Sequence, residues 1–366
     1  MKKLIPLFII LFALVTACDN GGSNSGSDFD RRAMLEHYGQ RIIRPTFDAL
    51  EYQVKGLESN VDNFLFIQDS LSLVSLRSWW KLTFTSWQAA NAFNFGPAGE
   101  EGTKKSLVEE IGTFPVSETK IEDAVNAGQW NVNDFNRDAR GLLTVEYLIF
   151  GKNQTPDEVL NAFQVSPNRR NFLKALSENI ATRVASVNSE WKGIYYDSFV
   201  NQDGTDVGSS TSLLYNEFVR SYEALKNFKV ALPLGKRPGQ IQPEPQLVEA
   251  YYSSFSLNAL QQHLKAIEDL WHGRAYTGQD GPGFREYLES VEGGDALIAQ
   301  TEAQLSVVKA ALAAVPASPS LSEQMAAETP ELVALNDELQ KLTRFFKSDM
   351  SSLLGIAITY ASGDGD

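Results

Sequence analysis

Apolar side chains recur at three- and four-residue spacing along most of this chain, which is the pattern of an α-helix with one apolar face. The clearest stripes cover residues 172–191, 257–271 and 332–353. The sequence offers no convincing run of alternating apolar and polar residues between hairpin turns, the signal of a strand. The pattern therefore predicts an all-α protein.

Glycine, proline and small polar residues interrupt the helical stripes and mark the expected loops. The longest polar gap is NQDGTDVGSS, residues 201–210. Long helices joined by short loops usually pack as antiparallel bundles. We therefore predict two antiparallel helical bundles, one formed by residues 28–200 and the other by residues 201–366.

The N-terminus joins two lysines to a short apolar run, which ends in small residues before Cys18, the only cysteine. This run is too short to span a membrane and has the layout of a secretory signal peptide. A cysteine directly after the small residues resembles a bacterial lipobox, in which the thiol is acylated. We expect residues 1–17 to be cleaved and Cys18 to carry lipid. Residues 18–27 then form a flexible tether to the cell envelope, on its periplasmic side or at the outer-membrane surface.

Composition and charge narrow the classes of partner. The formal net charge is −14, and loss of the two lysines in the signal takes it to −16. Such a surface repels phosphate backbones, so we expect no nucleic-acid partner. With lipid on Cys18, no cysteine is left for a disulfide or a thiolate metal site, and stability must come from packing.

Few residues suit catalysis. The histidines are His37, His263 and His272, and the last two lie nine positions apart on one predicted helix. They therefore face opposite sides of that helix and cannot share a metal from it. The HExxH zinc motif, the phosphate-binding loop, the dinucleotide fingerprint and the GxSxG nucleophile motif are all missing from the sequence.

One segment stands out, RGLLTVEYLIFG at residues 140–151. As a helix over 142–150 it is apolar on nearly every side, so it should lie inside a bundle. Glu146 is then a buried carboxylate, which needs an arginine, a hydrogen-bond network or a metal, or must stay protonated. A structural ion pair that locks two helices together is the plainer alternative to a functional role.

This segment resembles the GxHxxE signature of the imelysin family. Gly141 and Glu146 occupy their places in it, and Leu143 stands where the family has histidine. Other parts of the chain resemble the family in the same order, and they cover nearly the whole mature chain. They are Trp87-Gln88 with the following NFGPA at 94–98, the block EALKNFKVALPLG at 223–235, YSSFS at 252–256, and LGIAITY at 354–360 leading into GDGD.

The resemblance implies an exported protein of two helical bundles with a site near the interface between them. It also implies one of two activities, because family members are known as metallopeptidases and as proteins of iron-regulated uptake. Leu143 cannot bind a metal, so we favour a non-catalytic, lipid-anchored binding protein linked to iron or haem uptake. The site residues expected from the motif and its surroundings are Gly141, Leu143, Glu146, Arg140 and Trp87.

Two alternatives stay open. The first is a metallopeptidase whose metal is held by Glu146 and by a histidine from elsewhere, such as His37. The second is a carboxylate-only site for a hard cation such as calcium. The favoured hypothesis assigns no catalytic residue, no metal ligand and no cofactor, and leaves a small molecule, a metal or haem as the ligand.

Overall fold

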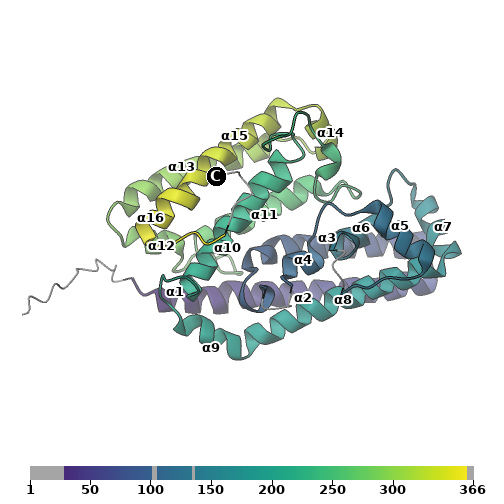
Figure 1. Cartoon of the computed structure of the whole chain (residues 1–366), viewed down its shortest axis with the longest axis horizontal. Coiled ribbons are helices and arrows are strands. Elements are labelled where there is room, and N and C mark those ends of the chain that lie inside the picture. The colour runs from purple at the N-terminus through teal and green to yellow at the C-terminus, as the bar shows by residue number, and fades with distance from the viewer. Residues whose placement is uncertain (1–28, 101–104, 134–136, 361–366) are drawn as a thin grey trace, which may run out of the picture.

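The computed structural model describes residues 29–100, 105–133 and 137–360, and this part of the chain contains helices and no strand (Figure 1). The prediction of an all-α fold is confirmed. Cys18, the signal and the tether lie outside the described residues. Within the described part, no helix is both long and apolar enough to cross a membrane.

The first bundle is built on three long helices, α2 (Arg44–Ile67), α3 (Ser70–Ala90) and α8 (Pro167–Lys192). Helix α2 packs along both of the others. A two-residue turn separates α2 from α3, and the Asp69 carboxylate caps α3 by accepting from the Ser72 N–H at 2.8 Å. Shorter helices complete this half: α1 (Arg31–His37), η1 (Tyr38–Ile43), η2 (Asn91–Phe93), η3 (Gly96–Ala98), α4 (Leu107–Ile111), α5 (Glu118–Ala127), η4 (Arg137–Ala139), α6 (Leu142–Phe150), α7 (Pro156–Val165) and α9 (Ile194–Asn201).

The second bundle is built on α10 (Ser210–Ala224), α11 (Ser256–Trp271), α13 (Gly294–Ala314) and α15 (Pro330–Arg344). Its centre is aromatic, because the ring of Phe218 packs on those of Phe284 and Phe346 with centroids 5.4 and 4.7 Å apart. The remaining helices of this half are η5 (Leu225–Ala231), η6 (Pro245–Leu247), α12 (Phe284–Glu289), α14 (Leu321–Ala326), η7 (Phe345–Asp349) and α16 (Met350–Leu354).

The two bundles pack directly on each other. Helix α9 ends at Asn201 and α10 begins at Ser210, on either side of the polar gap. Figure 1 shows the first bundle below and the second above, and α11 packs against α3 across the junction. Their apolar side chains form one continuous core. The domain boundary at residues 201–210 remains a prediction, because the two bundles share one apolar core and no gap in the packing marks where one ends.

Helix α6 lies inside the first bundle, as its uniformly apolar sequence predicts, and all its residues except the last are buried. It contacts α3, α7 and α8. Gly141 precedes it with φ +80°, and a Cβ built there would lie 2.6 Å from the carbonyl oxygen of Ile111. Only glycine fits this turn without strain. The indole N–H of Trp80 donates to the Leu142 carbonyl at 2.7 Å and holds the start of the helix in place.

Candidate functional site

Glu146 projects from α6 into a buried polar region, and only 1% of its surface is exposed. Its Oε1 accepts a hydrogen bond from the backbone N–H of Ser253 at 2.8 Å. Burial is the main cause that raises the pKa of Glu146 to about 8; hydrogen bonds from Ser253 lower it and the charge of Glu249 raises it. Glu146 is therefore mostly protonated at neutral pH.

Lys229 and Glu249 form a buried ion pair beside it. The Nζ of Lys229, on η5, lies 2.8 Å from Oε2 of Glu249, and both side chains are 5% exposed. Gln88 of α3 bridges the pair, since its Oε1 accepts from Lys229 and its Nε2 donates to Glu249 at 3.3 Å. Burial lowers the pKa of Lys229, while Glu249 raises it. Lys229 and Glu249 both belong to the second bundle, so it is the side-chain amide of Gln88 that joins this pair to the first bundle.

His263 of α11 lies in the same region and is 1% exposed. Its Nε2 is 2.8 Å from Oγ of Ser221, whose hydroxyl also donates to Oδ1 of Asn91 at 3.3 Å. Burial lowers the pKa of His263 well below its usual range, and the charge of Lys229 lowers it further, so the ring is neutral. Its Nδ1 is buried and finds no hydrogen-bond partner among the described residues. A buried ring nitrogen without a hydrogen-bond partner calls for an explanation such as a bound ligand or water.

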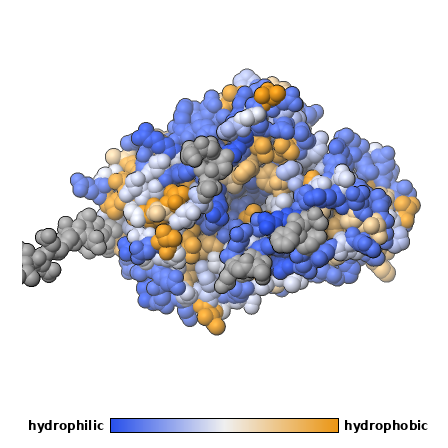
Figure 2. Space-filling view, viewed as in Figure 1, coloured by the Kyte–Doolittle hydropathy of each residue, from blue (hydrophilic) through white to orange (hydrophobic). Residues whose placement is uncertain are grey.

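These groups surround a cavity of about 120 Å³ between the bundles. Its lining combines the apolar side chains of Trp87, Val108 and Phe114 with polar groups that include Lys229, Glu249 and His263. Figure 2 shows that this face of the molecule is hollowed between the two halves. The full lining comprises Trp87, Asn91, Asn94, Val108, Gly112, Phe114, Glu217, Arg220, Ser221, Ala224, Lys229, Glu249 and His263. We call it the interbundle pocket.

Glu217 adds a second carboxyl group with a shifted pKa to the interbundle pocket. Burial raises its pKa to about 7, and the nearby Arg220, whose Nη1 lies 2.9 Å from Glu217 Oε1, lowers it. Near neutral pH this group changes charge readily. The pocket can therefore adapt its charge to a ligand by taking up or releasing a proton.

Comparisons with known proteins identify the family and the fold of this chain. The family model described as Imelysin matches residues 43–345. The chain belongs to the imelysin family. The comparison with curated proteins gives no significant match.

Two solved structures share the imelysin fold with this chain. One, from Parabacteroides distasonis, is provisionally described as an iron-regulated protein A precursor; it has a TM-score of 0.73 and 15% identity, with 90% of this chain and 97% of that chain covered. The other is an imelysin-like protein from Psychrobacter arcticum, with a TM-score of 0.71 and 16% identity, covering 92% and 99% of the two chains. At these identities the likeness concerns the fold.

The residues of the degenerate GxHxxE motif, Gly141, Leu143 and Glu146, are not part of the lining of the interbundle pocket. Trp87 lines it, and its ring packs so tightly on Gly112 that a Cβ there would lie 2.5 Å from the indole. Glu146 is linked to the pocket electrostatically, because the charge of Glu249, a lining residue, raises the pKa of Glu146. Leu143 is buried in the core at 3% exposure and is not part of the lining.

Arg140, which we expected beside Glu146, is held elsewhere. Its Nη2 lies 3.2 Å from Oε1 of Glu110, on α4, and its Nη1 donates to the Val132 carbonyl. The other carboxylate oxygen of Glu110 lies 3.3 Å from Nε of Arg183, on α8. These contacts hold α4 and α8 against the segment before α6, so the described contacts of Arg140 stabilise the fold.

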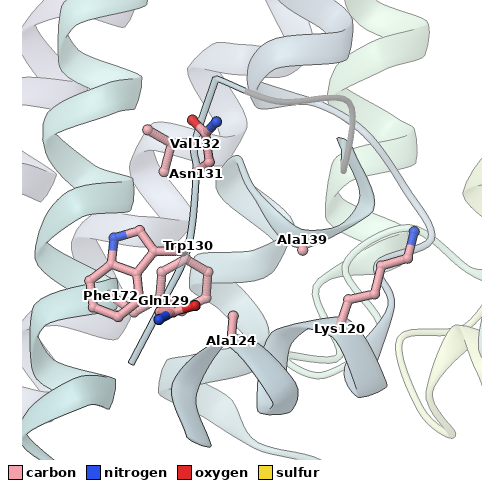
Figure 3. A pocket seen from close by; sticks show the side chains of 8 residues that line it. All are labelled: Lys120, Ala124, Gln129, Trp130, Asn131, Val132, Ala139 and Phe172. Atoms are coloured by element: carbon pink, nitrogen blue, oxygen red, sulfur yellow. The ribbon is translucent and has the colours of Figure 1, made fainter. Parts of the chain in front are cut away.

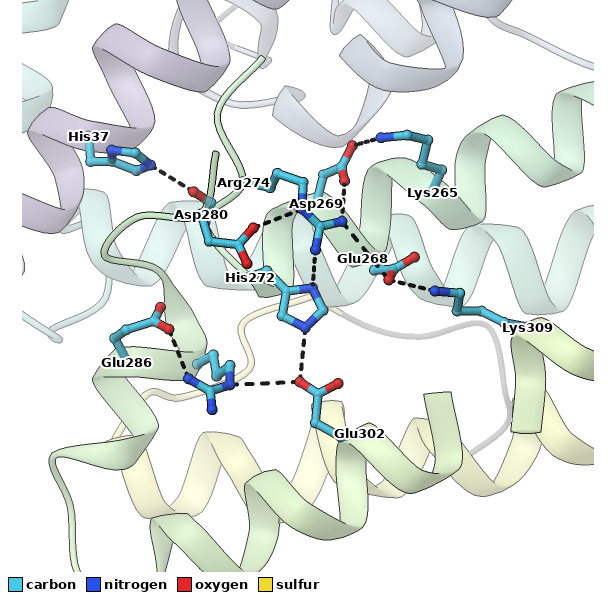
Figure 4. A network of polar contacts seen from close by, with 12 residues as sticks. His37, Lys265, Glu268, Asp269, His272, Arg274, Asp280, Glu286, Glu302 and Lys309 are labelled. Atoms are coloured by element: carbon cyan, nitrogen blue, oxygen red, sulfur yellow. Dashed lines mark hydrogen bonds and ion pairs between the residues drawn. The ribbon is translucent and has the colours of Figure 1, made fainter. Parts of the chain in front are cut away.

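His37 and His272 lie in a different polar network, drawn in Figure 4. Nε2 of His37 contacts the Gly273 carbonyl at 2.7 Å, and Nε2 of His272 contacts Glu302 at 2.9 Å. Figure 1 places α1, which carries His37, at the left end of the first bundle and α6 towards its right end. His37 is thus in no position to share a ligand with Glu146.

The residues do not fit a zinc centre. In the parts of the chain that the structure describes, no three His, Cys, Asp or Glu side chains come together as a metal site would require. Leu143 stands where the family has histidine, and the ammonium of Lys229 already neutralises Glu249, the carboxylate whose charge acts on Glu146. We therefore derive no step through a metal.

Sequence reasoning missed Lys229, Glu249 and His263 as members of one site. Two signals were available: Lys229 stands in the apolar run of the 223–235 block, and His263 lies on the apolar face of its helix stripe. Both are polar groups at buried positions, which need partners. What the sequence could not show is that three separate elements bring these partners together.

The first bundle holds another cavity, shown in Figure 3, of about 350 Å³. Trp130 and Phe172 form its apolar wall, with ring centroids 5.1 Å apart, and Lys120 stands at its edge. Its single charged group makes it a weaker candidate than the interbundle pocket.

Proposed function

We propose that this protein is an exported, lipid-anchored binding protein of the imelysin family that takes a small polar ligand into the interbundle pocket and acts in iron acquisition. The observation that carries the proposal is the unsatisfied Nδ1 of His263 in the lining of a cavity that also contains the Lys229–Glu249 pair and the aromatic rings of Trp87 and Phe114. Apolar walls with a few convergent polar groups are typical of ligand sites.

The size of the interbundle pocket limits the ligand. Drug-sized ligands occupy cavities of roughly 300–1,000 Å³, whereas this one measures about 120 Å³. Haem is therefore too large for the pocket as it stands, and a ligand of a few heavy atoms fits better. The link to iron rests on the description of the Parabacteroides distasonis neighbour as an iron-regulated protein.

A binding role fits the residues better than hydrolysis does. A metallopeptidase needs a bound metal to polarise the substrate and lower the pKa of water, with a general base to take the water's proton. Here the family histidine is Leu143, Glu146 is mostly protonated and already accepts from Ser253, and His263 is neutral beside Lys229. The metallopeptidase of the imelysin type remains the alternative function.

The experiment compares the wild-type protein, isolated from its own cells, with an Ala224→Leu variant by native mass spectrometry. Ala224 lines the pocket, so leucine fills it without changing any charge. Ala311→Leu on α13 is the matched control, because Ala311 is also partly buried but lies outside the pocket. We expect a small non-covalent adduct on the wild type and on the control, and none on Ala224→Leu.

Two results would contradict this function. An adduct that persists in Ala224→Leu would place the ligand outside the interbundle pocket. Zinc at one equivalent, lost with Glu146→Ala and accompanied by chelator-sensitive peptide cleavage, would establish the peptidase instead. The iron link is tested separately: cells that carry only Ala224→Leu should contain less iron under iron limitation than cells with the control variant.

A further inference from the structure

A second concave site lies within the second bundle, and its charge is opposite to that of the protein as a whole. The cavity measures about 440 Å³. Its lining contains five cationic side chains and, among the described residues, no carboxylate, although the chain carries a formal charge of −14. The cations are Lys226, Lys236, Arg237, Arg344 and Lys347. Three of these cations pair with carboxylates outside the lining: Lys236 with Glu328 at 2.6 Å, Arg344 with Asp349 at 3.1 Å and Lys347 with Glu223 at 3.0 Å. The charged groups of the lining itself are all cationic, and a concave surface of one sign attracts the opposite sign. We call this the basic pocket.

Two π-helical segments form walls of the basic pocket. Lys226 and Asn227 come from η5, and Lys347 and Ser348 come from η7. π-helical turns are rare and occur often at functional sites. Helix α15, which leads into η7, packs against η5, so the two segments are held on neighbouring elements.

Contacts behind the lining position the cations. Nζ of Lys226 donates to Oε1 of Gln340 at 3.1 Å, and Nζ of Lys347 lies 3.0 Å from Oε1 of Glu223. The guanidinium of Arg237 lies 5.4 Å from the ring centre of Phe228. The side chains are therefore pre-oriented, which reduces the entropy lost when a ligand binds.

We propose that the basic pocket binds the phosphate group of a small molecule. A tetrahedral phosphate presents oxygens in several directions, which suits cations that converge from two walls, whereas a planar carboxylate is recognised from one side. Asn227, Thr343 and Ser348 add neutral polar side chains to the lining. The cavity is larger than one phosphate requires, so it leaves room for the organic part of the ligand.

The test is calorimetric titration of the full-length protein with inorganic phosphate at low ionic strength. The variant is Arg237→Gln with Arg344→Gln, which removes two charges from the lining; the Arg344 side chain is 76% exposed, so its loss should spare the fold. The control is Arg32→Gln with Lys55→Gln, two cations with side chains 55% and 63% exposed on the first bundle. It changes the net charge equally.

We expect the wild type and the control to bind phosphate alike and the Arg237/Arg344 variant to bind at least about tenfold more weakly, since a charge-assisted hydrogen bond is worth about that much. Absence of binding in the wild type, or an equal loss in the control, would overturn the proposal. An equal loss in the control would mean that the overall charge of the protein, and not the basic pocket, governs phosphate binding.

Further arms identify the source of the phosphate. Binding to glycerol phosphate without binding to phosphatidylglycerol vesicles supports a soluble phosphate ester, and vesicle binding that the Arg237/Arg344 variant loses supports a lipid headgroup. A competitor within the chain is tested with Asp364→Asn and Asp366→Asn, two residues outside the described part. If phosphate binds only to the variant that lacks these two aspartates, then the chain's own acidic segment competes for the basic pocket, and the proposal of an external ligand is wrong.

Discussion

At the scale of single residues, the protonation of Glu146 governs how stability depends on pH. Its folded-state pKa of about 8 lies above its ordinary value of 4.5. Below pH 4.5 both the folded and the unfolded state bind the proton. Between these two values the unfolded state loses it and the folded state keeps it, so stability falls as pH rises.

Glu146→Gln should therefore stabilise the protein at neutral pH. Glutamine keeps an acceptor for the Ser253 N–H and never ionises. The gain should reach about 3 kcal/mol at pH 7, since each pKa unit is worth about 1.4 kcal/mol, and vanish below the ordinary pKa of glutamate. Urea denaturation across this pH range measures it. A gain of equal size at low pH would show that burial of the charge is not the cause.

Glu249→Gln is the matched contrast, because the same chemical change should destabilise the fold there. It leaves the ammonium of Lys229 buried without its carboxylate. Removing one partner of a buried pair costs about 3–5 kcal/mol. Denaturation of both variants at pH 7 compares the two directly, and a stabilised Glu249→Gln would refute the buried ion pair as a structural element.

At the scale of elements, the turn into α6 depends on Gly141. Alanine there meets both a positive φ and the Ile111 carbonyl, so Gly141→Ala should cost more than the roughly 1–3 kcal/mol of backbone strain alone. Gly208→Ala is the control, because φ is +91° but no atom lies within 4 Å of the added Cβ. Thermal unfolding should separate the two variants, and equal losses would mean that the contact with Ile111 relaxes freely.

The positions of the helices are the feature that the sequence predicted best. The stripe over residues 172–191 lies in α8, the stripe over 257–271 lies in α11, and the apolar segment 142–150 coincides with α6. Helical periodicity is a local property of the sequence, so it is visible without the fold. The stripe over 332–353 is one continuous helical stretch, although its π-helical part, η7, was not foreseen.

At the scale of the whole molecule, the lipid anchor at Cys18 is the first prediction to test. Cys18→Ser should release the protein from membranes or block its processing, because a diacylated and N-acylated cysteine is what would hold it there. Fractionation of cells with an antibody to the protein measures this. Ser23→Ala in the tether is the control and should stay with the membrane; a membrane-bound Cys18→Ser cut at the same site would refute the lipoprotein hypothesis.

The polar gap at residues 201–210 should be the first site of limited proteolysis. Val207 there is 71% exposed, and such loops are nicked before packed helices. Because α11 packs on α3 and the core is continuous, the two fragments should still elute together in size-exclusion chromatography. Fragments that separate would mean that the bundles fold and persist independently.

The sequence by itself determined the helical fold, the family and the burial of Glu146, because periodicity, motif order and an apolar helix are all read along the chain. It could not determine which partners the buried polar groups find. Only the tertiary structure placed Ser253 against Glu146, and joined Lys229, Glu249 and His263 from η5, the 248–255 segment and α11 around Trp87. Two contacts at the site join residues more than a hundred positions apart: Glu146 with Ser253, and Gln88 with Lys229. Such pairings depend on how the bundles pack, which no local pattern encodes.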